Sequence, residues 1–148
     1  MPRFFKRLGE GIFDINDLTE QTHGLARFVQ EAAKAYRFDP DKVVAVGYSN
    51  GANIAGSMLI LHPEALAGAV LFRPMVPFVP DTMPQLPGKP ILILAASRDT
   101  MVRKEETERL ASLLGRAGAD VTLRWADATH AISGEELKTA REWLSVEF

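Results

Sequence analysis

The chain is organised around the stretch Val43-Val44-Ala45-Val46-Gly47-Tyr48-Ser49-Asn50-Gly51-Ala52-Asn53-Ile54-Ala55. A run of β-branched residues ends at Val46, a Gly-x-Ser-x-Gly sequence follows, and a proline-free helical pattern continues to His62. This order predicts a buried strand, a sharp turn with Ser49 at its apex, and a helix. Gly47 and Gly51 lack the Cβ atoms that would collide where the two arms of the turn come close.

A Gly-x-Ser-x-Gly sequence also has a simpler interpretation. It can be a glycine-rich turn that packs a helix against a strand or binds phosphate at the helix N-terminus. The flanks decide between the two interpretations, because an exposed nucleophile requires a strand immediately before the turn and a helix immediately after it. Both are present here, so we favour Ser49 as a nucleophile.

Composition places the chain among ordinary globular proteins. It has 148 residues, is 47% hydrophobic and carries a net charge of −2, so nucleic acid is not an expected partner. The absence of cysteine excludes disulfides and thiolate chemistry. No apolar run is long enough to span a membrane, and the basic N-terminus lacks the apolar core of a signal peptide. We expect one cytoplasmic domain over residues 1–148, with no metal, cofactor or membrane partner.

The sequence contains four short apolar runs, and helical patterns flank all of them except at the loop 73–89, which joins the second run to the third. The runs are continuous rather than alternating, which is typical of parallel strands covered on both faces. A capping box at Asp17 and Glu20 predicts the start of a first helix, and one at Ser133 and Glu136 predicts the start of the last. These patterns indicate an α/β fold with about four parallel strands and helices on both faces. The strands are expected at 43–46, 69–72, 91–95 and 121–125, and a third amphipathic helix at 104–117.

Two segments are expected to lack regular structure. Residues 1–16 contain scattered glycines and aromatic residues, and residues 73–89 contain five prolines, which exclude helix and strand. Long loops in compact domains are usually functional. Because this loop leaves the strand next to the Ser49 strand, we expect Arg73, Met75 and Phe78 to line a substrate pocket beside Ser49.

Three candidate catalytic residues follow three different strands. Ser49 follows the first strand, Asp99 the third and His130 the fourth, so all three belong to the carboxyl edge of the sheet, where sites form in open α/β folds. The chain order Ser, Asp, His is that of α/β-hydrolases. It predicts that Ser49 attacks an acyl carbon, His130 moves the proton, and Asp99 orients the imidazole.

Each of these residues has a plainer alternative. His130 could cap a helix, and Asp99 could be an ordinary turn residue. Asp127 is a rival acid, although it lies very close to His130 in the chain. His23 and His62 fall on or at the end of predicted helices and are interpreted as structural. The placement of three residues after three strands favours the catalytic interpretation.

Several motifs together resemble the bacterial phospholipase/carboxylesterase group of α/β-hydrolases, which is related to dienelactone hydrolases. They are Met1-Pro2-Arg3-Phe4-Phe5, Val46-Gly47-Tyr48-Ser49-Asn50-Gly51-Ala52-Asn53, Leu71-Phe72-Arg73-Pro74-Met75-Val76-Pro77, Ser97-Arg98-Asp99 and Thr129-His130. The resemblance implies a triad of Ser49, Asp99 and His130, and it implies that the backbone N–H of Asn50 is one oxyanion donor. It implies a serine esterase acting on small acyl or aryl esters without a cofactor.

The sequence departs from that group at its N-terminus. The resemblance implies earlier strands and a His-Gly-rich loop that supplies a second oxyanion N–H, none of which is in this sequence. Loss of one such donor typically slows turnover by about 10²- to 10³-fold. The competing hypothesis is therefore a catalytically impaired α/β-hydrolase fragment that serves as a binding or assembly module.

The same comparison makes a prediction about association. In the group, strand 43–46 is paired on both flanks, so here one flank is expected to be an open apolar edge, which favours pairing with another chain. A second copy in a homodimer is the favoured partner. The alternatives are an N-terminal fragment on a separate chain and coverage by residues 4–13.

Overall fold

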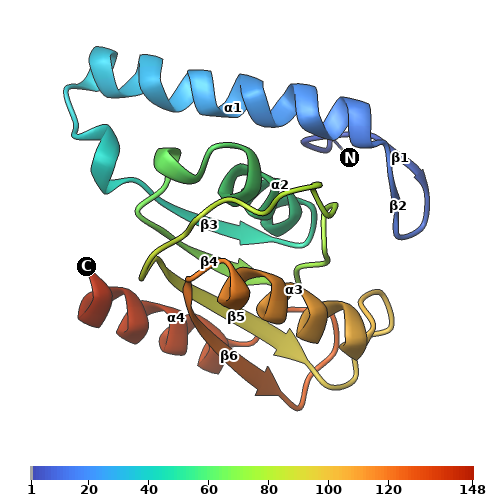
Figure 1. Cartoon of the computed structure of the whole chain (residues 1–148). Helices are drawn as coiled ribbons and strands as arrows, with labels where there is room; N and C mark the ends of the chain where they lie inside the picture. The colour runs from blue at the N-terminus through green and yellow to red at the C-terminus, as the bar shows by residue number, and fades with distance from the viewer. Residues whose placement is uncertain (1) are drawn as a thin grey trace.

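The fold is a four-stranded parallel sheet with helices on both faces (Figure 1). The computed structural model describes residues 2–148, and the strand order β3-β4-β5-β6 follows the order of the chain. This arrangement confirms the predicted fold class. The strands are β3 (Val44–Tyr48), β4 (Gly68–Phe72), β5 (Pro90–Ala96) and β6 (Asp120–Ala126), and the α-helices are α1 (Ile15–Tyr36), α2 (Asn50–Leu61), α3 (Lys104–Arg116) and α4 (Gly134–Glu147).

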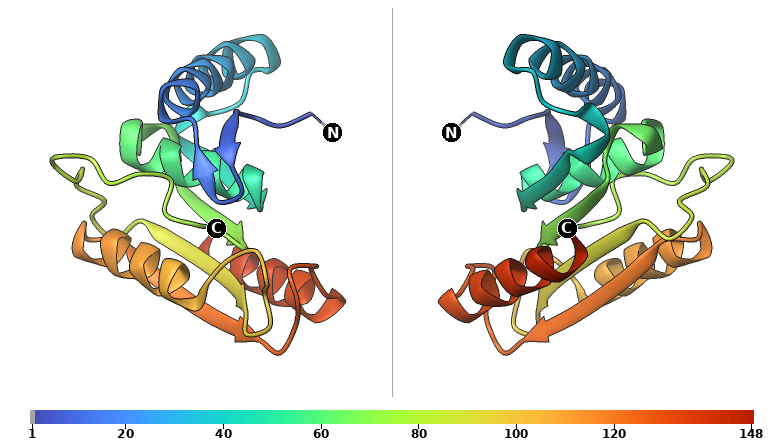
Figure 2. Two further views of the ribbon diagram at one scale, coloured as in Figure 1. Left: turned by 90° about the vertical axis from the view of Figure 1, so that its right-hand side faces the viewer. Right: turned by 90° about the vertical axis from the view of Figure 1, so that its left-hand side faces the viewer.

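The two faces of the sheet are covered unequally. Helices α2 and α3 pack on one face, with α1 lying outside α2, and α4 covers the other (Figure 2). The central strands β4 and β5 alternate their side chains between these two layers: Leu71 and Ile93 face α2 and α3, whereas Val70 and Leu92 face α4. Burial on both sides explains the continuous apolar runs in the sequence.

The first helix begins earlier than the sequence suggested. Asp14 is its N-cap and its Oδ1 accepts a hydrogen bond from the Asp17 backbone N–H (3.0 Å). Asp17, the predicted cap, instead accepts from the Lys6 N–H through Oδ2 (2.6 Å). Tyr36, in the last turn of the helix, is 79% exposed, because the helix buries the stripe that contains Leu18, Thr22, Ala26 and Ala33.

The N-terminal segment is more regular than predicted. β1 (Arg7–Gly9) and β2 (Ile12–Phe13) form a small antiparallel hairpin, whose turn contains Gly11 at φ 69°. A positive φ is readily available to glycine, which explains its place in the turn. Phe5 is buried against Leu18 and Ile54, so the segment is anchored to α1 and α2. Figure 1 shows the hairpin near the arrowheads of the strands.

Strand β3 forms one edge of the sheet within residues 2–148. Val46 is 61% exposed on it, and an apolar groove beside the strand is lined in part by Leu25, Val29 and Ile54, with Phe4 on its border. Pairing of this edge with a second copy or with a separate N-terminal fragment stays a prediction. In the same described range, no helix has the length and apolar character needed to cross a membrane.

Candidate active site

The turn after β3 forces Ser49 into an unusual backbone conformation. Ser49 has φ 53° and ψ −111°, and its N–H donates to the Phe72 carbonyl (2.8 Å). A Cβ on Gly47 would lie 2.5 Å from the backbone carbon of Gly51 and 2.6 Å from the nitrogen of Ala52, closer than atoms can approach. The strand end and the helix start can therefore meet only around glycine, and their meeting raises Ser49 at the apex.

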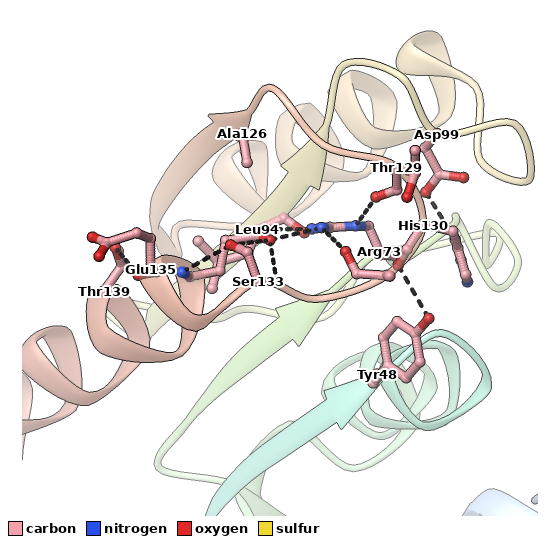
Figure 3. A network of polar contacts seen from close by, with 12 residues as sticks. Tyr48, Arg73, Leu94, Asp99, Ala126, Thr129, His130, Ser133, Glu135 and Thr139 are labelled. Carbon is pink, nitrogen blue, oxygen red and sulfur yellow. Dashed lines mark hydrogen bonds and ion pairs between the residues drawn. The ribbon is translucent and has the colours of Figure 1, made fainter.

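The structure brings Ser49, His130 and Asp99 together. The Ser49 Oγ lies 3.0 Å from His130 Nε2, and His130 Nδ1 lies 2.8 Å from Asp99 Oδ2. The three residues follow β3, β6 and β5, whose carboxyl ends meet at one edge of the parallel sheet. The site therefore places a hydroxyl, an imidazole and a carboxylate in one hydrogen-bonded line, and Figure 3 shows the contact between His130 and Asp99.

Hydrogen bonds fix the orientation of the Asp99 carboxylate toward His130. The Asp99 side chain is 2% exposed, and its Oδ1 accepts from the backbone N–H groups of Met101 (2.8 Å) and Val102 (3.0 Å). These bonds leave Oδ2 directed at the imidazole. The rival Asp127 is 86% exposed and pairs with Arg98, whose Nε lies 2.7 Å from its Oδ1. The geometry thus selects Asp99 as the carboxylate beside His130.

A cavity adjoins Ser49 and His130. The predicted residues Asn50 and Met75 line it, and Asn50 is also the first residue of α2, where backbone N–H groups have no partner within the helix. The Met75 N–H donates to the Asn53 Oδ1 (2.8 Å), which fixes the start of the long loop beside the site. The N-terminal segment closes the other side of this cavity. Its lining residues there are Arg3, Phe5, Arg7, Glu10, Gly11 and Phe13.

Two of the expected pocket residues behave differently. Arg73 borders the cavity, but its side chain is fully buried, and every N–H of its guanidinium donates to a protein acceptor, so none is left for a substrate. Phe78 lies in a neighbouring hollow with Ile12 and Val79 and packs toward the Phe5 cluster. The loop before it passes α2, where Pro77 lies beside Gly56, and α3, where the Val76 N–H donates to Glu106. Of the three loop residues, only Met75 offers a side chain at the cavity.

Sequence reasoning missed the residues that hold the His130 loop. Tyr48 donates from its hydroxyl to the His130 carbonyl (3.1 Å), and its ring lies 5.3 Å from the imidazole. Glu136 pairs with Arg73 in addition to forming the predicted capping box with Ser133. The position of Tyr48 next to Ser49 was a usable signal. The pairing of Glu136 with a residue 63 positions away was not visible in the sequence.

Burial and hydrogen bonding act in opposite directions on Glu136. Burial of the carboxyl acts to raise its pKa, but hydrogen bonds from Arg73 and from the Ser133 N–H and hydroxyl, together with the charge of Arg73, outweigh it. The pKa of Glu136 therefore lies below its ordinary value. The carboxyl is ionised at neutral pH and balances the buried guanidinium.

The remaining histidines lie away from Ser49. His23 and His62 contact each other, with Nδ1 to Nε2 at 2.7 Å, where α1 passes the end of α2. This contact joins helix α1 to the C-cap of α2, and the interpretation of both residues as structural stays a prediction. Over the part of the chain that the structure describes, no three His, Cys, Asp or Glu side chains are grouped to hold a metal ion.

Comparison with known proteins agrees with the fold and shows the family to which the chain belongs. A family model described as "Dienelactone hydrolase family" matches residues 10–142 of this chain. MhqD of Bacillus subtilis, named as a hydrolase, is 46% identical over 143 residues, which are 97% of this chain and 72% of MhqD. The carboxylesterase of Bacillus cereus superposes with a TM-score of 0.97 at 47% identity, covering 100% of this chain and 70% of its own. That of Mesorhizobium loti has a TM-score of 0.88 at 34% identity, with coverage of 97% and 68%.

The close approach at Gly47 generates a prediction. Gly47→Ala should lower the free energy of unfolding by about 2 kcal/mol or more, because the added methyl meets backbone that cannot move aside. The control is Gly115→Ala on α3, where nothing lies within 4 Å of the added methyl and alanine should stabilise the helix by about 0.5–1 kcal/mol. Urea unfolding measures both. Equal effects at the two sites would contradict this account of the turn.

The lowered pKa of Glu136 predicts a pH dependence of stability. A carboxyl with a depressed folded pKa stabilises the fold fully above its unfolded value, about 4.3, and this contribution is lost as the pH falls through the folded pKa. The difference in unfolding free energy between wild type and Glu136→Gln should therefore be constant from pH 7 to 5 and shrink below about pH 4.5. Urea titrations at each pH measure it, with Glu135→Gln as the charge control. A difference that stays unchanged to pH 3 would contradict the prediction.

Proposed function

Because the chain belongs to the dienelactone hydrolase family and is a hydrolase of carboxylesterase type, we propose that it is a serine carboxylesterase for small acyl or aryl esters. The observation that carries the proposal is the pair of contacts from Ser49 Oγ to His130 Nε2 and from His130 Nδ1 to Asp99 Oδ2. Serine hydrolysis requires a nucleophile, a base and an orienting acid in this connectivity.

In the proposed mechanism, the tautomer of His130 is fixed by Asp99. An ionised carboxylate only accepts hydrogen bonds, so the imidazole donates its Nδ1–H to Asp99 and leaves Nε2 free to accept. Nε2 then takes the Ser49 proton as the Oγ attacks the acyl carbon of the ester. The resulting imidazolium is stabilised by Asp99 and gives the proton to the departing alcohol.

The second half of the reaction uses the same groups. A water molecule loses a proton to His130 Nε2 and attacks the acyl group on Ser49, and the proton returns to the serine oxygen as the acid leaves. The negative oxygen of each tetrahedral intermediate is placed beside the Asn50 backbone N–H and the positive end of α2. The cavity beside Ser49 is small, and Phe5, Phe13, Met75 and Met101 form part of its lining. This favours esters with short or flat apolar acyl groups.

Labelling with a fluorophosphonate probe tests the nucleophile. The adduct should map to Ser49 by mass spectrometry, because that oxygen alone is proposed to be activated by an imidazole. Ser49→Ala should not label and should lose turnover of p-nitrophenyl acetate by about 10³-fold or more. Ser112→Ala, at an exposed position on α3, is the control. Folded protein that labels elsewhere, or equal turnover with and without Ser49, would contradict the proposal and favour a non-catalytic role.

A pair of isosteric substitutions tests the acid. Asp99→Asn removes the charge that holds the imidazole tautomer and should lower kcat by about 10⁴-fold. Asp127→Asn changes the exposed rival carboxylate in the same way and should leave kcat unchanged. Steady-state kinetics with p-nitrophenyl acetate measure both variants. A larger loss in Asp127→Asn would assign the orienting role to Asp127 instead.

A further inference from the structure

The buried guanidinium of Arg73 makes five hydrogen bonds with its five N–H groups. Two go to Glu136, with Nη1 to Oε1 at 2.5 Å and Nη2 to Oε2 at 2.9 Å. A third goes from Nη1 to the Leu94 carbonyl (3.0 Å) at the carboxyl end of β5. The remaining two leave the sheet and reach the loop that carries His130. Arg73 thus connects the ends of two strands to that loop (Figure 3).

The two loop contacts lie on either side of His130. Nε donates to the Thr129 carbonyl (3.2 Å) and Nη2 to the Ala131 carbonyl (2.8 Å). The carbonyl between them, that of His130 itself, accepts from the Tyr48 hydroxyl (3.1 Å). Three consecutive carbonyls are therefore held by side chains from the ends of β3 and β4. In a segment without helix or strand, these bonds set where the imidazole is presented.

Glu136 makes this arrangement possible. A guanidinium buried without a counter-charge is strongly unfavourable, whereas here the Glu136 carboxylate pairs with it in two parallel bonds. The same carboxylate accepts from the Ser133 N–H and hydroxyl (both 3.0 Å), which fixes the N-cap of α4 three residues after His130. The loop is consequently tied at its middle by Arg73 and at its end by Glu136.

We propose that Arg73, held by Glu136, is a positioning residue that sets the orientation of His130 between Ser49 and Asp99. This inference rests on the proposed function, since it assigns Arg73 a task in that triad. The planar fork of arginine is required, because its two edges serve Glu136 and the Thr129 and Ala131 carbonyls at the same time. Lysine keeps the charge but has a single ammonium that cannot span these acceptors.

Arg73→Lys is therefore the informative variant. A purely structural ion pair tolerates lysine opposite Glu136, whereas a positioning role does not. We expect kcat for p-nitrophenyl acetate to fall by about 10- to 100-fold, because small displacements of a catalytic group have effects of this size. KM should change little, because the guanidinium makes no substrate contact. Fluorophosphonate labelling of Ser49 should slow by a similar factor.

A second readout does not depend on activity. The proton shared by His130 Nδ1 and Asp99 is expected to give a downfield ¹H resonance in wild type, assigned by its loss in Asp99→Asn. Arg73→Lys should broaden or shift this resonance. Ile91→Val is the matched control, since it perturbs the core at the amino end of β5, away from the site, and should leave kcat and the resonance unchanged.

The outcomes separate the two proposals. Folded Arg73→Lys with wild-type kcat and an unchanged resonance overturns the positioning role, even where Ser49→Ala is inactive and the esterase proposal stands. Activity that is independent of Ser49 overturns the esterase proposal, and the resonance then decides the role of Arg73 alone. Should Arg73→Lys fail to fold, Glu136→Gln takes its place, and unchanged kcat and resonance in that folded variant overturn the inference.

Discussion

The close approach of the β3 end to the α2 start is the constraint on which the site depends. Only glycine fits at position 47, and the turn it permits holds Ser49 at a positive φ above the sheet edge. The parallel strands bring the other site residues to Ser49. Because β4, β5 and β6 run parallel to β3, the loops that follow them lie at the same edge of the sheet. The strained backbone of Ser49 is stabilised by the packing of α2, in which every residue from Ala52 to Ile60 is buried.

Much of this arrangement could be predicted from the sequence, because local chemistry decides it. Four continuous apolar runs gave the strands, and Ser49, Asp99 and His130 were expected together because each follows a strand end. The side-chain partners of Arg73 could not be predicted, since they lie up to 63 residues away. The sequence pointed to Asp17 as the first helix cap, whereas in the structure Asp14 accepts from the Asp17 N–H and Asp17 accepts from the distant Lys6 N–H. The position of the Phe78 side chain, in the hollow with Ile12 and Val79, likewise depends on tertiary packing and could not be predicted.

The carboxylates around the site are each held by defined hydrogen-bond donors. Asp99 accepts two backbone N–H bonds with one oxygen and faces the imidazole with the other, whereas Asp127 is engaged by Arg98 at the surface. Glu136 balances Arg73 and caps α4. Across residues 2–148, no buried side-chain nitrogen or oxygen lacks a hydrogen-bond partner, as expected of a polar network that orients its members.

The edge position of β3 has a consequence for the order in which the molecule opens. Its backbone is hydrogen-bonded to β4 on one side, whereas the loops with Asp99 and His130 follow β5, which is paired on both flanks, and β6, whose end is tied down through Arg73 and Glu136. Amide exchange should therefore be faster in β3 than in β5, since local opening begins where a segment has fewest partners. Because Ser49 directly follows β3, local opening of this strand would break its contact with His130 while the His130–Asp99 contact, made between the loops after β6 and β5, could persist.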